Sequence, residues 1–124
     1  MDCAKITYGF GSYDCSKADS IKMYILGMFL AREVSSDISF FRQWLFDPEY
    51  TCIDGNTIEL DKESGYILLR DTYSQEKIPT TLKMSNQQFL KLLDDWEEKV
   101  IKLKPKEVTI KYENDEFVIE TKNE

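Results

Sequence analysis

Four carboxylates stand close together in the segment LLDDWEEKVIK: Asp94, Asp95, Glu97 and Glu98. Carboxylates bind divalent cations, and they act as general acids or bases where a site changes their pKa values. On a helix, however, these positions spread over a broad arc. Two of the acids precede a lysine by four residues, in the pairs Asp95–Lys99 and Glu98–Lys102. The spacing therefore predicts a solvated helix face, with metal ligation or acid–base catalysis as the less favoured alternative.

The rest of the sequence offers few groups for catalysis. It contains no histidine, so the commonest general base at neutral pH and the usual partner of a serine or cysteine nucleophile are missing. The segment Gly9–Gly11 follows a strand pattern, but Asp14 occupies the third glycine position of a phosphate-binding loop, which favours a bend or bulge instead. We therefore expect no catalytic residue, cofactor or metal site, and keep a carboxylate- or metal-dependent enzyme as the weakest alternative.

Net charge indicates the kind of partner, and the cysteines and the N-terminus indicate the cellular compartment. The 124 residues include 23 acids and 16 bases, a net charge of −7, which disfavours direct contact with nucleic acid or an anionic membrane and favours a cationic partner. The three cysteines are widely spaced and form no CxxC pair, so reduced thiols in the cytosol are expected rather than disulfides or zinc. The N-terminus MDCAKITYGF has no signal-peptide pattern, and the apolar run MYILGMFLA is too short to span a bilayer. These features predict a cytoplasmic location.

The elements that must position these groups can be predicted from periodicity. Alternating apolar residues over 6–10 predict a first strand, and GSYDCSKAD predicts a loop after it. The segment IKMYILGMFLAREV fits a helix capped by Asp19 or Ser20. Its apolar residues cover nearly every side, so residues 20–34 could also form a buried strand, although a helix is the preferred interpretation.

A second helix is predicted over SSDISFFRQWLFDPEY, with Ser36 or Asp37 as its cap and Pro48 at its end. Its apolar stripe contains Ile38, Phe41, Trp44 and Leu45. Three strands are predicted next, over TIEL, YILLRD and TTLKM. Gly65 permits the turn between the first two, and Pro79 indicates that the third is an edge strand or begins at this residue.

The clearest predicted element is the helix that begins at Ser85. Ser85 and Gln88 form a capping box, and Met84 and Phe89 are placed to form a hydrophobic staple. One face at helical spacing contains Phe89, Leu92, Leu93, Trp96, Val100 and Leu103. For both tryptophans of the chain we expect core packing, with anchoring of a partner as the alternative.

The last segment predicts a hairpin whose register can be stated. If Asn114 and Asp115 form a two-residue loop, the facing pairs are Glu113–Glu116, Tyr112–Phe117 and Ile110–Ile119. The chain shows no repeat or linker, so we expect one domain over residues 1–124. The element order β-α-α-β-β-β-α-β-β predicts an α+β fold, with a mostly antiparallel sheet and about three helices packed on it.

Three motifs within residues 55–120 resemble those of a known family. They are the strand pair ending in LLRD, the helix M-S-x-x-Q-F-x-x-L-L-D-x-W-E, and the hairpin K-P-K-E-V-x-I-x-Y-E-N-D-E-F. Together they resemble small bacterial immunity proteins of polymorphic toxin systems, including contact-dependent growth inhibition, and the first half of the chain resembles them more loosely. The resemblance implies a chain that is not an enzyme, and that binds and blocks the toxin C-terminal domain made by its own locus. Such toxins are often nucleases, and a tRNase is one candidate.

Charge is consistent with that role, because a nuclease attracts phosphate with a cationic cleft that an acidic inhibitor complements. No contact with nucleic acid, membrane or small-molecule substrate is expected. Within residues 47–64 we expect the toxin contacts Asp47, Glu49, Tyr50, Asp54, Glu59, Asp61 and Glu63, with ordinary connecting loops and a solvated hairpin as the alternative. A small acidic adaptor or ligand-binding module unrelated to toxins is the second functional hypothesis.

Overall fold

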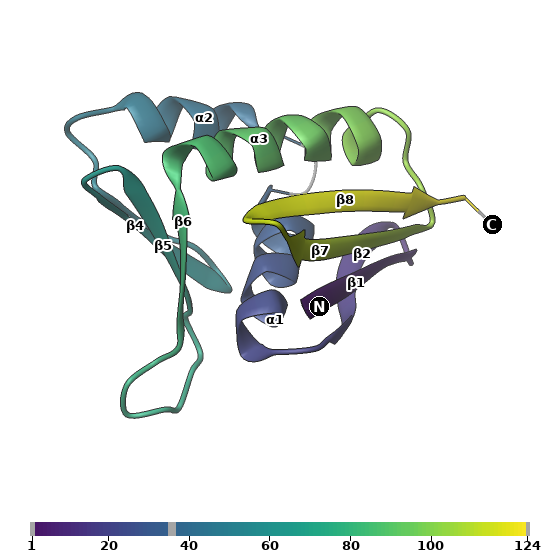
Figure 1. Ribbon diagram of the computed structural model, residues 1–124, viewed down its shortest axis with the longest axis horizontal. Coiled ribbons are helices and arrows are strands. Elements are labelled where there is room, and N and C mark those ends of the chain that lie inside the picture. Colours follow the sequence, from purple (N-terminus) through teal and green to yellow (C-terminus); the bar gives the residue numbers. More distant parts are fainter. Residues whose placement is uncertain (1, 35–36, 124) are drawn as a thin grey trace.

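The structure is a computed structural model that describes residues 2–34 and 37–123 (Figure 1). Its strands are β1 Asp2–Gly9, β2 Ser12–Ala18, β3 Cys52–Asp54, β4 Ile58–Glu63, β5 Tyr66–Asp71, β6 Thr81–Ser85, β7 Glu107–Glu113 and β8 Glu116–Lys122. Its helices are α1 Ile21–Met28, α2 Ser39–Phe46 and α3 Asn86–Trp96. π-Helical segments continue two of them, η1 Phe29–Val34 after α1 and η2 Glu97–Ile101 after α3.

The strands form two antiparallel sheets of four strands each. One sheet has the order β2-β1-β7-β8, and the other has the order β3-β4-β5-β6. The predicted α+β class, with antiparallel pairing and three helices, is confirmed. The strands are divided between two sheets instead of forming the one sheet that we expected, and α1 lies between them (Figure 1).

The structure contains two strands, β2 and β3, that the sequence did not predict. The segment GSYDCSKAD was expected to be a loop, but its residues 12–18 form β2, which pairs with β1. The Gly9–Gly11 segment is the turn of that hairpin rather than a bend or bulge within one strand, because Phe10 (φ 54°) and Gly11 (φ 85°) are both left-handed. Likewise β3, only three residues long, forms within the segment expected to connect α2 to β4. Neither strand shows apolar alternation in the sequence: Tyr13 is the one buried position in β2, and β3 has no buried position.

Residues 21–34 are helical throughout, which confirms the preferred interpretation over a buried strand. Ser20 is the N-cap, and its hydroxyl accepts a hydrogen bond from the amide of Met23 at 3.2 Å. Apolar residues on nearly every side suit a helix that packs between two sheets. Gly27 permits the close approach to β2, since a Cβ there would lie 2.6 Å from the sulfur of Cys15.

The N-cap of α2 lies one residue after Asp37, the later of the two predicted caps. Its N-cap is Ile38, which makes no capping side-chain hydrogen bond. Asp37 instead accepts hydrogen bonds from the hydroxyl and from the amide of Ser39, and these bonds lower the pKa of the Asp37 carboxyl. The other predicted cap, Ser36, lies outside the described residues. The predicted stripe is confirmed as buried: Ile38, Phe41, Trp44 and Leu45.

The helix α3 begins as predicted. The Ser85 side chain accepts from the Gln88 amide, the Gln88 side chain accepts from the Ser85 amide, and the staple residues Met84 and Phe89 are both buried. Leu103 was expected on the buried face but is 64% exposed, because η2 ends at Ile101 and the chain then turns away. The predicted C-terminal hairpin is confirmed in its full register, with Asn114 and Asp115 at φ 52° and 60°.

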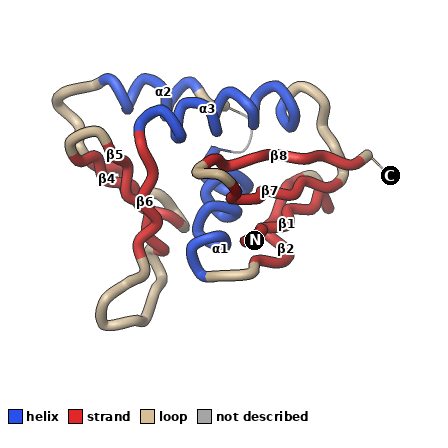
Figure 2. Tube along the Cα trace, in the orientation of Figure 1, coloured by secondary structure: helices blue, strands red, loops and turns tan. Residues whose placement is uncertain are grey.

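One continuous core joins the inner faces of both sheets to the three helices. In Figure 2, α2 and α3 run along one side of the molecule and α1 fills the space between the sheets. Both tryptophans belong to this core, as predicted. Within residues 2–34 and 37–123, no helix is both long and apolar enough to traverse a lipid bilayer.

Candidate functional site

Alternation along β4 separates its apolar residues from its acids. Ile58 and Leu60 are buried in the core, so the intervening residues Glu59, Asp61 and Glu63 point to the opposite face. That face of the β3-β4-β5-β6 sheet is on the left in Figure 1, where no helix of residues 2–34 and 37–123 covers it. Half-buried antiparallel sheets commonly leave one face in water, and here β4 puts three carboxylates on it.

The register of β3 adds a fourth carboxylate. Asp54 pairs with Glu59, and Cys52 pairs with Asp61, so the side chains of Cys52 and Asp54 lie on the same face as the β4 acids. We call the group Asp54, Glu59, Asp61 and Glu63 the acidic sheet face. It contains four of the seven residues that the sequence predicted for toxin binding, and the strand backbone holds them in fixed relative positions.

Arg70 is a basic residue within the acidic sheet face. It stands on β5 opposite Glu59, and its Nη1 lies 2.5 Å from Asp61 Oδ2 and 3.7 Å from Glu59 Oε1. The hydrogen bond with Asp61 raises the pKa of the Arg70 guanidinium. These side chains are partly exposed, so each pair contributes on the order of 0–1 kcal/mol to stability. Asp54 and Glu63 form no ion pair with any described residue, which leaves two carboxylates free for a partner.

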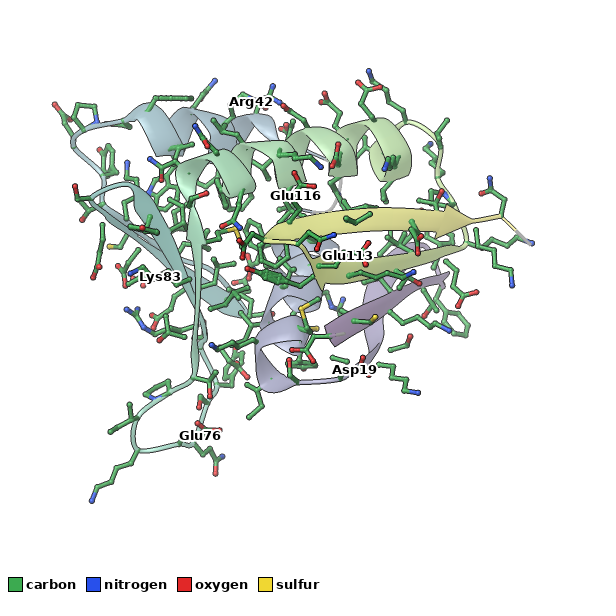
Figure 3. All side chains as sticks on the ribbon, in the orientation of Figure 1. Asp19, Arg42, Glu76, Lys83, Glu113 and Glu116 are labelled. Carbon is green, nitrogen blue, oxygen red and sulfur yellow. The ribbon has the colours of Figure 1, made fainter. Side chains whose placement is uncertain are left out.

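The rest of the uncovered face is less acidic. Tyr66 and Leu68 follow the alternation of β5, and Lys83 on β6 places its ammonium 4.2 Å from the centre of the Tyr66 ring. Figure 3 shows Lys83 on the same outer side of the molecule. The face thus has carboxylates towards β3 and β4, and an aromatic ring with a cation towards β6.

The other three predicted residues lie outside the acidic sheet face. Asp47, Glu49 and Tyr50 belong to the connection between α2 and β3. Asp47 ends α2, and its Oδ1 accepts a hydrogen bond from the Glu49 amide at 2.9 Å. The Tyr50 side chain is 63% exposed. The alternative interpretation of residues 47–64, ordinary connecting loops and a solvated hairpin, fits both this connection and the β4–β5 hairpin that carries the acids of β4.

A pocket lies between this connection, α2 and β3. Its volume is about 390 Å³, and it is lined by Phe40, Gln43, Trp44, Asp47, Tyr50, Cys52 and Ile53. We call it the aromatic pocket. Sequence reasoning included Asp47 and Tyr50 but missed the other lining residues. Phe40 is the one signal that could have indicated the pocket, because this large aromatic ring falls outside the predicted apolar stripe of α2 and is 57% exposed.

Lys62 fixes the wall of the aromatic pocket from β4. Its ammonium donates to the carbonyl oxygens of Trp44 at 2.5 Å and Asp47 at 2.6 Å, and lies 4.9 Å from the centre of the Trp44 ring. Trp44 itself is 5% exposed, and its indole N–H is buried without a hydrogen-bond acceptor among the described residues. Lys62 therefore joins the end of α2 to β4 and holds the pocket beside the acidic sheet face.

The acids of α3 and η2 are spread over the helix surface. Asp94 pairs with Arg42, and Glu98 pairs with Lys102 at 2.7 Å, as predicted for the second pair. The predicted pair between Asp95 and Lys99 is wrong: Asp95 pairs with Lys91, and the Lys99 ammonium donates to the carbonyl of Ile119 on β8. Among the residues the structure describes, no three His, Cys, Asp or Glu side chains are grouped so that they could hold a metal ion.

The structure thus defines an α+β protein of two antiparallel sheets with an acidic, uncovered sheet face beside an aromatic pocket. Comparisons with protein-family models, curated proteins and solved structures found no match for this chain.

Proposed function

We propose that this chain is a cytosolic immunity protein that binds a cognate toxin domain and neutralises it in a stoichiometric complex. The toxin domain is a cationic nuclease, with a tRNase as one candidate. The observation that supports the proposal is the acidic sheet face, where two adjacent strands present four carboxylates on a surface that none of the described helices covers. Inhibition by such a complex needs complementary shape and charge and no catalytic group.

Electrostatics favours this kind of partner. A nuclease must attract phosphates, so its substrate cleft is positive, and a rigid negative surface speeds encounter with it. The backbone positions of the acidic sheet face have a fixed spacing because they belong to paired strands rather than to a connecting loop. Arg70 keeps Glu59 and Asp61 in place while Asp54 and Glu63 stay unpaired within the described part of the chain.

Co-expression tests the proposal directly. Cells that produce the toxin domain encoded beside this chain should survive when they also produce this protein, and the two should co-purify in a one-to-one complex. Continued killing, or the absence of a complex between the purified proteins, would contradict the proposed function. A toxin domain from an unrelated locus serves as the specificity control.

Two variants with equal net charge test whether the acidic sheet face is the binding surface. The interface variant combines Asp54→Asn, Glu59→Gln, Asp61→Asn and Glu63→Gln. The control variant makes the same change in net charge elsewhere, with Glu97→Gln, Glu98→Gln, Glu113→Gln and Glu116→Gln; Figure 3 shows Glu113 and Glu116 at the hairpin tip, away from the uncovered sheet face. The interface variant should bind toxin at least about tenfold more weakly, mainly through slower association, and with a smaller dependence on salt. Equal losses in the two variants would show that net charge, and not this face, governs binding.

A further inference from the structure

We propose that the aromatic pocket receives an arginine side chain of the toxin domain. This inference rests on the proposed function and specifies its chemistry, because it names the residue type that enters a defined pocket at the edge of the acidic sheet face. Four observations support the inference: the aromatic walls of the pocket, the acids around it, the position of Lys62, and the short distance along β3 from the acidic sheet face to the pocket.

The walls suit a planar cation on an aliphatic stem. Phe40 and Tyr50 both line the pocket with more than half of their side-chain surface exposed, so their rings are available to a ligand. A guanidinium group stacks on aromatic rings, and the three methylene groups that carry it pack on apolar side chains such as Ile53. Arginine combines both properties and is among the residues most enriched at the energetic centres of interfaces.

The charge of the surroundings requires a cation. Asp47 lines the pocket and forms no ion pair with a described residue; its Oδ1 accepts from the Glu49 amide, so Oδ2 is free to accept from a ligand. A second hollow, of about 400 Å³, shares Phe40 and Ile53 with the aromatic pocket and contains further acids, among them Glu33, Asp37 and Asp54. An apolar side chain would bury Asp47 without a partner, which is unfavourable.

Lys62 explains why the guanidinium of arginine fits better than the ammonium of lysine. The Lys62 ammonium already lies beside the Trp44 ring and is held by the carbonyls of Trp44 and Asp47. The compact cation site at this ring is therefore occupied by the protein itself. The open part of the pocket offers the flat rings of Phe40 and Tyr50 and one carboxylate, which match the flat, forked donor group of arginine.

The pocket is within reach of a partner bound to the acidic sheet face. Cys52 lines the pocket, and on the sheet it pairs with Asp61, a member of that face. Since β3 is the edge strand, no other strand in the described part of the chain separates the face from the pocket. A toxin surface that covers the four carboxylates can therefore place one arginine beyond β3, where its side chain enters the pocket.

Cys52 allows the pocket to be tested without the toxin, because its thiol is free and exposed. The protein is equilibrated with two disulfide reagents of equal length, one ending in guanidinium and one in the neutral urea analogue, and the mixed disulfide on Cys52 is quantified by mass spectrometry of its peptide. A thiol introduced by Thr121→Cys, on β8, measures the preference caused by net charge alone. We expect Cys52 to favour guanidinium over urea at least about fivefold more than the control thiol does.

Two substitutions test whether the pocket causes the preference of Cys52 for the guanidinium reagent. Phe40→Ala and Asp47→Asn should each reduce the ratio at Cys52 towards the ratio at the control thiol. The thermal unfolding midpoint should stay nearly unchanged, because Phe40 is exposed and Asn at position 47 keeps the oxygen that accepts from the Glu49 amide. A ratio at Cys52 equal to that of the control thiol, or one unaffected by either substitution, overturns the inference.

The toxin experiment separates this inference from the proposed function. The Phe40→Ala, Asp47→Asn double variant should bind toxin at least about tenfold more weakly, and one toxin arginine replaced by lysine should cause a matching loss that is not additive with it. If the wild-type protein binds and protects but the double variant binds equally well, the pocket inference fails and the proposed function stands. If the wild-type protein binds no toxin, the proposed function fails and the inference fails with it.

Discussion

The hydroxyl of Tyr13 donates a hydrogen bond to the carbonyl oxygen of Pro105 at 2.6 Å, although the two residues are 92 positions apart. The Tyr13 ring also packs edge-on against Tyr8 and against Trp96 of α3. A single buried side chain thereby connects the β1–β2 hairpin, the end of the last helix, and the segment that leads into β7. The bond adds a side-chain link to the β1–β7 pairing and the Lys5–Glu107 ion pair, which also join the first and last parts of the described chain.

Removing that bond should destabilise the fold. Tyr13→Phe keeps the ring but leaves the buried carbonyl of Pro105 without its donor, so the free energy of unfolding should fall by about 1–3 kcal/mol. Urea unfolding followed by tryptophan fluorescence measures the change. Tyr8→Phe is the matched control, because the Tyr8 hydroxyl is exposed and makes no hydrogen bond to a described residue. Equal stability of wild type and Tyr13→Phe would show that water replaces the lost donor.

The protein should lose stability in alkaline solution. Burial, with a smaller effect from Tyr8, raises the pKa of Tyr13 above its ordinary value of 10.0, and burial raises the pKa of the Cys15 thiol above 9.0. The folded state therefore holds both protons more tightly than the unfolded state does. Their stabilising contribution is complete below these ordinary values and decreases as pH rises through the higher folded-state pKa values. Unfolding free energies measured between about pH 8 and pH 11 should decrease, and Tyr13→Phe should remove the part of the decrease that Tyr13 causes.

Gly55 should not accept a side chain. A Cβ at this position would lie 2.2 Å from the carbonyl oxygen of Ile58 and 2.7 Å from Cδ of Glu33, whose Oε1 accepts hydrogen bonds from the amides of Thr57 and Ile58. Gly55→Ala should therefore lower stability by about 1–3 kcal/mol and increase amide exchange in β3 and β4. Gly9→Ala is the control, since nothing lies within 4 Å of its Cβ position. Exchange rates in β3 that match those of the wild type would contradict this prediction.

Phe10→Asn should stabilise the protein. Phe10 is fully exposed at the tip of the β1–β2 hairpin and has a left-handed backbone, which is costly for a bulky residue. Asn tolerates that conformation, and Asn followed by Gly11 is the preferred sequence for a turn of this type. We expect a gain of about 1 kcal/mol in unfolding free energy, measured by thermal or urea unfolding. A loss of stability would indicate that the Phe10 ring packs on the fold.

Local chemistry predicted the second half of the chain well. The capping box of α3 and the Asn114–Asp115 hairpin are determined by residues within a few positions of each other, and both are confirmed. The partition into two sheets depends on distant pairings such as Ala4 with Ile110, which no local pattern reveals. The predicted Asp95–Lys99 ion pair was wrong for the same reason. Lys99 donates to a backbone carbonyl on β8, which is distant in sequence, and not to the nearby Asp95.

The candidate site was predicted in part for comparable reasons. Glu59, Asp61 and Glu63 were predicted as contacts within an acidic segment, but the predicted strand TIEL ended at Leu60, so their common face was not foreseen; it follows from the continuation of β4 to Glu63. The aromatic pocket could not be predicted, because the exposure of Phe40 depends on how α2 packs against β3 and β4. The short strand β3 joins the two features, and it carries too little alternation to be recognised in the sequence.

The division of strands between the sheets also sets an order for folding during translation. β3 to β6 are consecutive in the chain and pair only with their neighbours, so this sheet can form while the ribosome is still adding α3. β1 has only β2 to pair with until Glu107–Glu113 has been synthesised and has emerged. The sheet that carries the acidic sheet face can therefore fold first. In the nascent chain, one edge of β1 stays unpaired until β7 has been synthesised.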